Sequence, residues 1–140
     1  MLRARWVITG VALAGVIAIP ALASGDGRRV VGNCTKSQVR PTSIILTCGD
    51  ANSALTHLHW QRFGGVTAAA TGDYSANDCT PNCAAGKFHS YAARIVLSKA
   101  RVCPDKYDDY RVASLSFASA RPPGTKSAQT TISLAGCPLP

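Results

Sequence analysis

The sequence has no glutamate, and all seven of its acidic residues are aspartates. Glutamate favours helices whereas aspartate favours turns and caps, so this bias indicates a chain built of strands and loops. The Gly-x-Ser-x-Gly nucleophile elbow of many hydrolases is also absent. The basic residues do not alternate with aromatic side chains in a stripe, as they would on a nucleic-acid-binding surface. These absences argue against a helical fold, an enzyme and a nucleic-acid partner.

Long apolar runs are also lacking, except for one at the N-terminus. Residues 6–19 are apolar apart from one threonine, follow two arginines, and end at Pro20. Ala21 and Ala23 then supply small side chains at the −3 and −1 positions of a cleavage site before Ser24, which is the layout of a secretory signal peptide. The run of about 14 residues is shorter than the ~20 that a membrane span requires. We therefore predict a helical signal peptide over residues 1–23 and a secreted, extracellular mature chain that is not inserted in a membrane.

The mature chain contains six cysteines, which is an unusually high number for its length. An even count in an exported chain of this size indicates three disulfides, although six cysteines allow 15 pairings. Zinc thiolates would need short spacings that recur, and only one short pair occurs. We prefer pairing between neighbours along the chain: Cys34 with Cys48, Cys79 with Cys83, and Cys103 with Cys137.

The chain is basic, with 15 lysines and arginines and a net charge of +8. Without Arg3 and Arg5 in the signal peptide, 13 basic residues face seven aspartates, which leaves +6. A scattered cationic surface keeps a small protein soluble and also attracts anionic surfaces weakly. The expected partner is therefore an extracellular protein or an anionic component of the cell wall.

The mature chain reads as one domain. Residues 24–33 are expected to form a flexible lead-in, in which Val30 and Val31 make at most a short edge strand. Residues 34–140 are expected to form a single disulfide-bonded β domain. Short strand-like runs lie between frequent turn signals, and residues 87–98 and 110–117 alternate apolar with polar side chains. This pattern predicts a small antiparallel β-sandwich or barrel of about six or seven strands. The expected strands are residues 43–48, 54–63, 66–74, 87–98, 110–117 and 129–135.

One of these expected strands contains an irregularity. The apolar residues within 54–63 change from odd to even positions between Leu55 and Leu58. Such a change predicts a β-bulge or a brief helical turn before Trp60, since side chains alternate strictly in a regular strand. Trp60 itself is expected in the core.

Three histidines form the first candidate site. His57 and His59 lie two residues apart and would share one face of a strand, and His89 could join them from a neighbouring strand. Three imidazoles would make a copper or zinc site. The simpler interpretation is a pair of partly exposed histidines on a polar face, so no cofactor is predicted.

The second candidate site surrounds the short cysteine pair. Cys79 and Cys83 enclose Thr-Pro-Asn and would hold a rigid loop between two strands. Rigid loops bind well because they lose little entropy, but a ring this short is better suited to stapling a strand crossover than to display. We therefore assign speculative binding residues to the neighbouring surface: Asp73, Asp78, Lys87 and His89.

Three stretches together carry a resemblance: RPTSIILTCGDAN, LHWQRFGG and TGDYSANDCTPNCAAGKFHSY. They resemble an uncharacterised family of small secreted, six-cysteine proteins from actinobacteria, over most of the mature chain. The resemblance implies export and a compact disulfide-bonded domain, and it implies no catalytic residue. The expected function is that of an extracellular binding or accessory module. The alternatives are an inhibitor of an extracellular enzyme and a histidine-based metal-binding protein.

Overall fold

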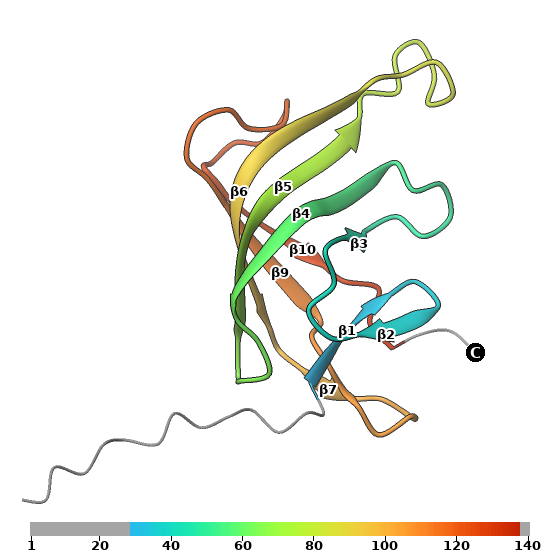
Figure 1. Cartoon of the computed structure of the whole chain (residues 1–140). Helices are drawn as coiled ribbons and strands as arrows, with labels where there is room; N and C mark the ends of the chain where they lie inside the picture. The colour runs from blue at the N-terminus through green and yellow to red at the C-terminus, as the bar shows by residue number, and fades with distance from the viewer. Residues whose placement is uncertain (1–28, 138–140) are drawn as a thin grey trace, which may run out of the picture.

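The computed structural model describes residues 29–137, and this part of the chain is all-β (Figure 1). The predicted signal peptide and residues 24–28 of the predicted lead-in lie outside the described residues. No helix within residues 29–137 has the length and apolar character needed to cross a membrane. The described strands are β1 Arg29–Asn33, β2 Lys36–Gln38, β3 Ile44–Ile45, β4 Ser53–Arg62, β5 Ala68–Asn77, β6 Phe88–Ser98, β7 Arg101–Val102, β8 Asp108–Asp109, β9 Val112–Phe117 and β10 Gln129–Ser133.

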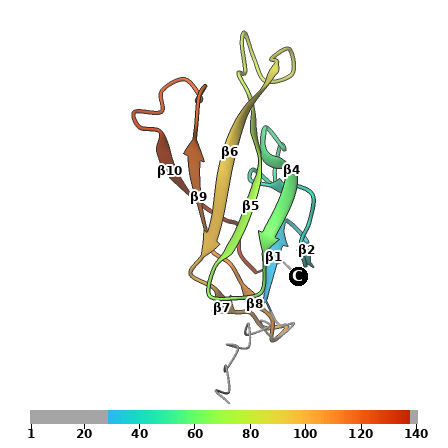
Figure 2. The same cartoon turned by 60° about the vertical axis from the view of Figure 1, so that its left-hand side comes forward.

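The larger sheet has six strands in the order β10-β9-β6-β5-β4-β3, and all neighbours are antiparallel. It curls into a half-barrel whose concave side faces the smaller sheet (Figures 1 and 2). β6 carries the alternation that the sequence predicts, because Ala93, Ile95 and Leu97 are buried while Arg94 is exposed. The predicted all-β fold is therefore confirmed, with four additional strands: β1 of five residues, and β2, β7 and β8 of two or three.

β4 contains the predicted bulge. Its register with β5 shifts between Thr56 and His59, so β4 has one more residue than β5 over this stretch. His57 takes up the extra length with a φ of 51°, in the left-handed region. The bulge turns Leu58 inward as well as Leu55, and both side chains are buried.

The hydrophobic core lies on the concave side of the six-stranded sheet. Its apolar side chains come from β4, β5, β6 and β9 and include Leu55, Ile95 and Leu115. Trp60, expected in the core, is partly buried and packs against it, and its Nε1 donates a hydrogen bond of 2.8 Å to the carbonyl oxygen of Pro41. The bond matters because a partly buried indole N–H without an acceptor would cost stability.

The smaller sheet has four strands in the order β2-β1-β8-β7. It corrects the predicted lead-in, since residues 29–33 form β1, with Val30 and Val31 buried. β1 is also not an edge strand, because it pairs antiparallel with β2 and parallel with β8. Burial of two valines between neighbouring strands supplies the apolar contacts that hold this segment in place.

Asp109 in β8 is the buried polar residue of this small sheet. Its Oδ1 accepts a hydrogen bond of 2.8 Å from the main-chain N–H of Gly32 in β1. Burial raises the pKa of Asp109, and the Gly32 N–H and the charge of Arg111 oppose that rise. The neighbouring Asp108 points the other way and pairs with Arg29 at 3.3 Å.

All six cysteines are paired, and the pairs are those predicted: Cys34–Cys48, Cys79–Cys83 and Cys103–Cys137. Two of these bonds join the sheets to each other. Cys48 follows β3 and Cys137 follows β10, which are the two edge strands of the larger sheet. Their partners, Cys34 and Cys103, lie next to β1 and β7 of the smaller sheet. Each edge of the half-barrel is therefore fastened to the smaller sheet.

Candidate functional site

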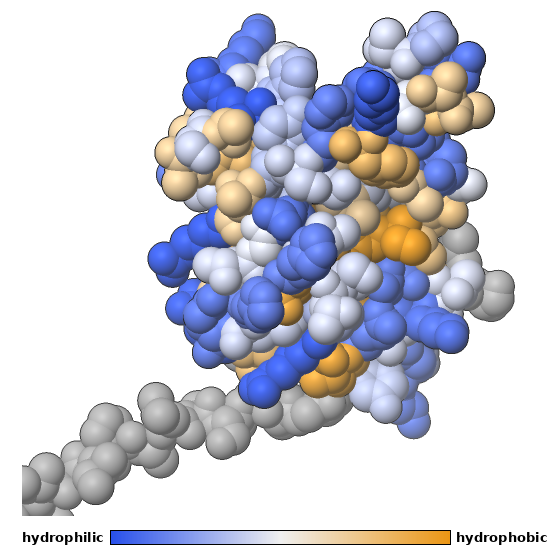
Figure 3. All heavy atoms as spheres, turned by 45° about the horizontal axis from the view of Figure 1, so that its top comes forward, coloured by the Kyte–Doolittle hydropathy of each residue, from blue (hydrophilic) through white to orange (hydrophobic). Residues whose placement is uncertain are grey.

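A groove opens at the end of the half-barrel away from the small sheet. Two loops rise there, residues 78–87 between β5 and β6 and residues 118–128 between β9 and β10 (Figures 1 and 2). The space-filling view shows the surface hollowed between two projections at this end (Figure 3). The groove has a volume of about 550 Å³. It is lined by Tyr74, Ala76, Asn77, Asp78, Thr80, His89, Tyr91, Pro122 and Pro123.

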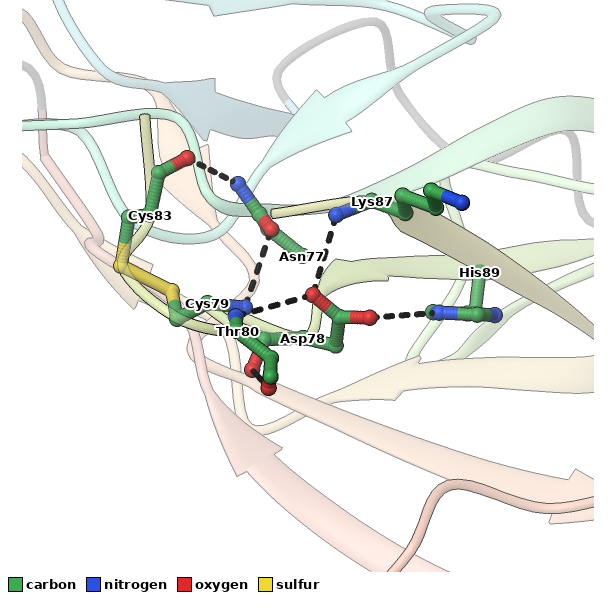
Figure 4. A network of polar contacts seen from close by, with 7 residues as sticks. All are labelled: Asn77, Asp78, Cys79, Thr80, Cys83, Lys87 and His89. Atoms are coloured by element: carbon green, nitrogen blue, oxygen red, sulfur yellow. Dashed lines mark hydrogen bonds and ion pairs between the residues drawn. A yellow bond between two sulfur atoms is a disulfide. The ribbon is translucent and has the colours of Figure 1, made fainter. Parts of the chain in front are cut away.

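Asp78 is the centre of the polar contacts on the loop side of this groove (Figure 4). Its Oδ1 accepts hydrogen bonds from the main-chain N–H groups of Lys87 at 3.0 Å and Thr80 at 3.1 Å. Its Oδ2 lies 3.0 Å from Nε2 of His89. One carboxylate therefore fixes the start of the loop, its end, and an imidazole on β6.

These donors also set the protonation of Asp78. The N–H of Lys87, the contact with His89 and the N–H of Thr80 lower the pKa of Asp78 from 3.8 to about 2. Hydrogen bonds to a carboxylate stabilise its charged form, which is why the pKa falls. Asp78 is thus ionised over the whole neutral and mildly acidic range.

Asn77 holds the disulfide ring beside Asp78. Its Nδ2 donates to the carbonyl oxygen of Cys83 at 2.8 Å and to Oδ1 of Asn52 at 2.9 Å, and its Oδ1 accepts from the N–H of Cys79 at 3.0 Å. A Cβ on Gly86 would overlap Oδ1 of Asn77, so this position needs glycine for close approach. The ring is therefore secured by side-chain hydrogen bonds as well as by its disulfide.

The floor and the opposite wall of the groove are apolar. Tyr74 on β5 and Tyr91 on β6 lie on the concave face, and Tyr74 packs edge-to-face against Phe117 with ring centroids 6.4 Å apart. Pro122 and Pro123 face them from the β9–β10 loop. A second hollow of about 210 Å³ shares Tyr74 and both prolines, so the apolar surface continues beyond the first.

The speculative binding residues are only partly brought together. Asp78 and His89 meet at the groove, as expected for a joint site. Lys87 contributes its main-chain N–H, while its side chain is directed away from the carboxylate (Figure 4). Asp73 does not belong to this site, because it pairs with His57 at 2.9 Å elsewhere on the sheet.

The three histidines do not gather into a metal site. His57 pairs with Asp73, whereas His89 pairs with Asp78. In the β5–β6 register His89 lies opposite Ala76, which is three residues beyond Asp73 in β5. Within residues 29–137, the one group with metal-ligand geometry is Cys103, Asp109 and Cys137. Its two sulfur atoms form a disulfide and so offer no thiolate to a metal.

Sequence reasoning missed the apolar half of the groove. Tyr91 and His89 share the parity of Ala93 in β6, so the alternation already placed them on the concave face. Tyr74 lies directly opposite Tyr91 in the β5–β6 register. Pro122 and Pro123 gave no such signal, because a loop's position over a distant strand depends on the folded chain.

A scan of protein-family models, a search of curated proteins and a search of solved structures each found no match to this chain.

Proposed function

We propose that this protein is a secreted binding module whose ligand lies in the groove between the β5–β6 and β9–β10 loops. The observation that carries the proposal is the pairing of two tyrosines and two prolines with the fixed Asp78–His89 pair in one hollow. Such a mixture is typical of ligand sites, where apolar surfaces supply affinity and a few placed polar groups supply orientation.

The rigidity of the site supports this proposal. Both β strands of the groove floor are fully paired with each other, and the loop above them is tied by Asn77, Asp78 and a disulfide. A site that is ordered before binding loses less entropy when it takes a ligand. The three disulfides also fit an extracellular protein, since disulfides persist in oxidising compartments.

The proposal is tested by replacing one aromatic residue of the groove floor. Tyr91→Ala should weaken binding to isolated cell wall or to extracellular peptides at least tenfold, because it removes contact surface worth about 1.4 kcal/mol or more. Binding is measured by pull-down and by chemical-shift perturbation of the labelled mature protein.

Tyr107→Ala is the matched control, because Tyr107 is also a partly exposed tyrosine but does not line the groove. It should leave binding unchanged. If ligand shifts map outside the groove, or if both variants bind like the wild type, the proposed site is wrong.

Inhibition of an extracellular protease is a weaker alternative. The ring from Cys79 to Cys83 is short and its main chain is held by Asn77 and Asp78. An inhibitory loop offers an extended segment to the protease cleft, and this ring lacks one. No contact favours the inhibitor over the groove.

A further inference from the structure

β6 is longer than the strand beside it. Its register with β9 runs only from Ala93 to Ser98, whereas its register with β5 runs from Phe88 to Leu97. Among residues 29–137, residues 88–92 of β6 therefore have a strand partner on one side alone. After Phe117 the chain bends away into the β9–β10 loop, and Figure 2 shows β6 continuing beyond the end of β9.

The direction of the free main-chain groups follows from the hydrogen bonds around them. The N–H of Asp78 donates to the carbonyl oxygen of Lys87 at 2.9 Å, so the main-chain polar groups of Lys87 point toward the β5 side. Successive residues of an antiparallel strand direct their main-chain N–H and C=O groups to alternate sides. The main-chain groups of His89 and Tyr91 therefore also point toward β5. Ser90 must then direct its N–H and C=O toward the open side.

The bonds at the other end of β6 agree with this assignment. The N–H of Phe117 donates to the carbonyl oxygen of Ala128, toward β10. Ser116 therefore faces β6, and its partner there is Arg94, which has the same parity as Ser90. The open edge thus continues the line along which β6 pairs with β9.

This edge borders the groove. Tyr91 and His89, which line the groove, belong to the same five residues as Ser90, and Pro122 and Pro123 face them. A strand laid along the edge would direct every second side chain toward the tyrosines and prolines. Unpaired strand edges bind extended peptides in this way, with main-chain bonds for affinity and pockets for specificity.

We propose that the groove recognises an extended peptide of a partner protein, which adds to the free edge of β6 at residues 88–92 as a further β-strand. This inference rests on the proposed binding function of the groove and specifies its ligand. The peptide carries uncharged, apolar side chains at alternate positions, because no lysine or arginine lines the groove and Asp78 is already paired with His89.

Basic side chains near the edge indicate that the ends of the peptide are acidic. They also argue against a second copy of this chain as the occupant. Lys87 and Arg94 flank residues 88–92 and Arg121 precedes Pro122 in the opposite loop, and none of the three forms an ion pair within residues 29–137. Two copies paired edge to edge would bring these like charges together, which is unfavourable across a strand pair. A peptide with acidic residues at its ends complements them, so its affinity should fall with rising salt.

The test selects peptides from a display library of random short sequences against the intact, oxidised mature protein. Selected peptides should alternate apolar residues between acidic flanks. Ser90→Pro should weaken their binding about tenfold, because it removes an N–H on the open side, where an edge strand tolerates proline. Ser90→Thr keeps this N–H and should bind like the wild type.

A second arm does not depend on the folding of the proline variant. Selected peptides are N-methylated at the positions that face β6 and, separately, at the alternate positions. Only the first set should lose binding. Equal effects of the two sets, or no peptide selected at all, would overturn strand addition.

The two proposals fail in different ways. If Tyr91→Ala abolishes binding of a cell-wall ligand while Ser90→Pro has no effect on any ligand, the groove binds but does not add a strand. If neither variant matters, both proposals fail. If sedimentation shows a dimer that Ser90→Pro dissociates, the occupant is a second copy and the partner-peptide proposal is overturned.

Discussion

At the scale of single residues, Asp78 does the most to shape the candidate site. It satisfies two main-chain N–H groups at the two ends of a loop and positions His89 at the groove. An aspartate can do this where a glutamate cannot easily, because its short side chain bonds to the main chain two residues on. The absence of glutamate from the sequence is thus in keeping with the local chemistry here.

The protonation of Asp78 gives a prediction with a definite sign. Its folded pKa of about 2 lies below the ordinary value of 3.8, so the ionised carboxylate stabilises the folded loop. That contribution is complete above about pH 4 and is lost as the pH falls toward 2. The amide signals of Thr80 and Lys87 should shift with a midpoint near pH 2.

Asp78→Asn is the control for this titration, since it keeps the shape of the side chain and removes its charge. The variant should show no such step at Thr80 and Lys87. A midpoint at the ordinary aspartate value in the wild-type protein would mean that these hydrogen bonds do not persist in solution.

At the scale of elements, the bulge in β4 decides which side chains enter the core. His57 is the extra residue, and it lets Leu55 and Leu58 both face inward although they are three positions apart. Without the extra residue, Leu55, Leu58 and Trp60 would fall at regular alternate positions. The bulge therefore lengthens the outer face and leaves the inner pattern intact.

Two single-residue deletions test this reading. Deleting His57 should be tolerated with a loss of about 1 kcal/mol, since the inward pattern survives and only a surface pair with Asp73 is lost. Deleting His59 should cost about 2–5 kcal/mol, because either Leu58 or Trp60 must then leave the core. Urea unfolding measures both variants, and equal losses would contradict the role of the bulge.

Strand alternation made much of this fold predictable, and the missing parts have a common cause. The buried face of β6 and the parity change in β4 are local patterns, so the sequence displays them directly. The sequence predicts a flexible lead-in at β1 because two valines alone are a weak strand signal. Its stability comes from pairing with β8, about 80 residues later, where Asp109 accepts the N–H of Gly32.

The candidate site divides along the same line. Asp78 and His89 belong to one hairpin, so their proximity could be anticipated from the sequence. The sequence also suggests Asp73 for this surface, but Asp73 and the groove residue Tyr74 are adjacent in β5 and so face opposite sides of the sheet. Pro122 and Pro123 come from another hairpin, and only the curl of the sheet brings them over Tyr74.

At the scale of the whole molecule, the disulfides that join the two sheets should matter more than the small ring. Stabilisation by a crosslink grows with the length of chain that it closes, and the separations are 34 residues for Cys103–Cys137 and four for Cys79–Cys83. Replacing both cysteines of a pair by alanine should cost about 4 kcal/mol for the first pair and about 2 kcal/mol for the second.

Chemical denaturation of the two double-alanine variants measures these losses. The ring variant should also lose binding at the groove, because Asn77 and Asp78 would no longer meet a fixed loop. A ring variant that is less stable than the Cys103–Cys137 variant would show that the crosslinks act by a route other than chain entropy.

The disulfides at the edges of the half-barrel also determine how the domain bears tension. When tension is applied between residues 29 and 137, the shortest covalent path between them runs through the disulfides Cys34–Cys48 and Cys103–Cys137. Residues 35–47 and 104–136 then lie outside this loaded path. The second segment contains β9, β10 and the groove residues Pro122 and Pro123. The force passes through β4, β5, β6 and β7, so the β5–β6 side of the groove is strained while the side formed by Pro122 and Pro123 is shielded until a disulfide is reduced.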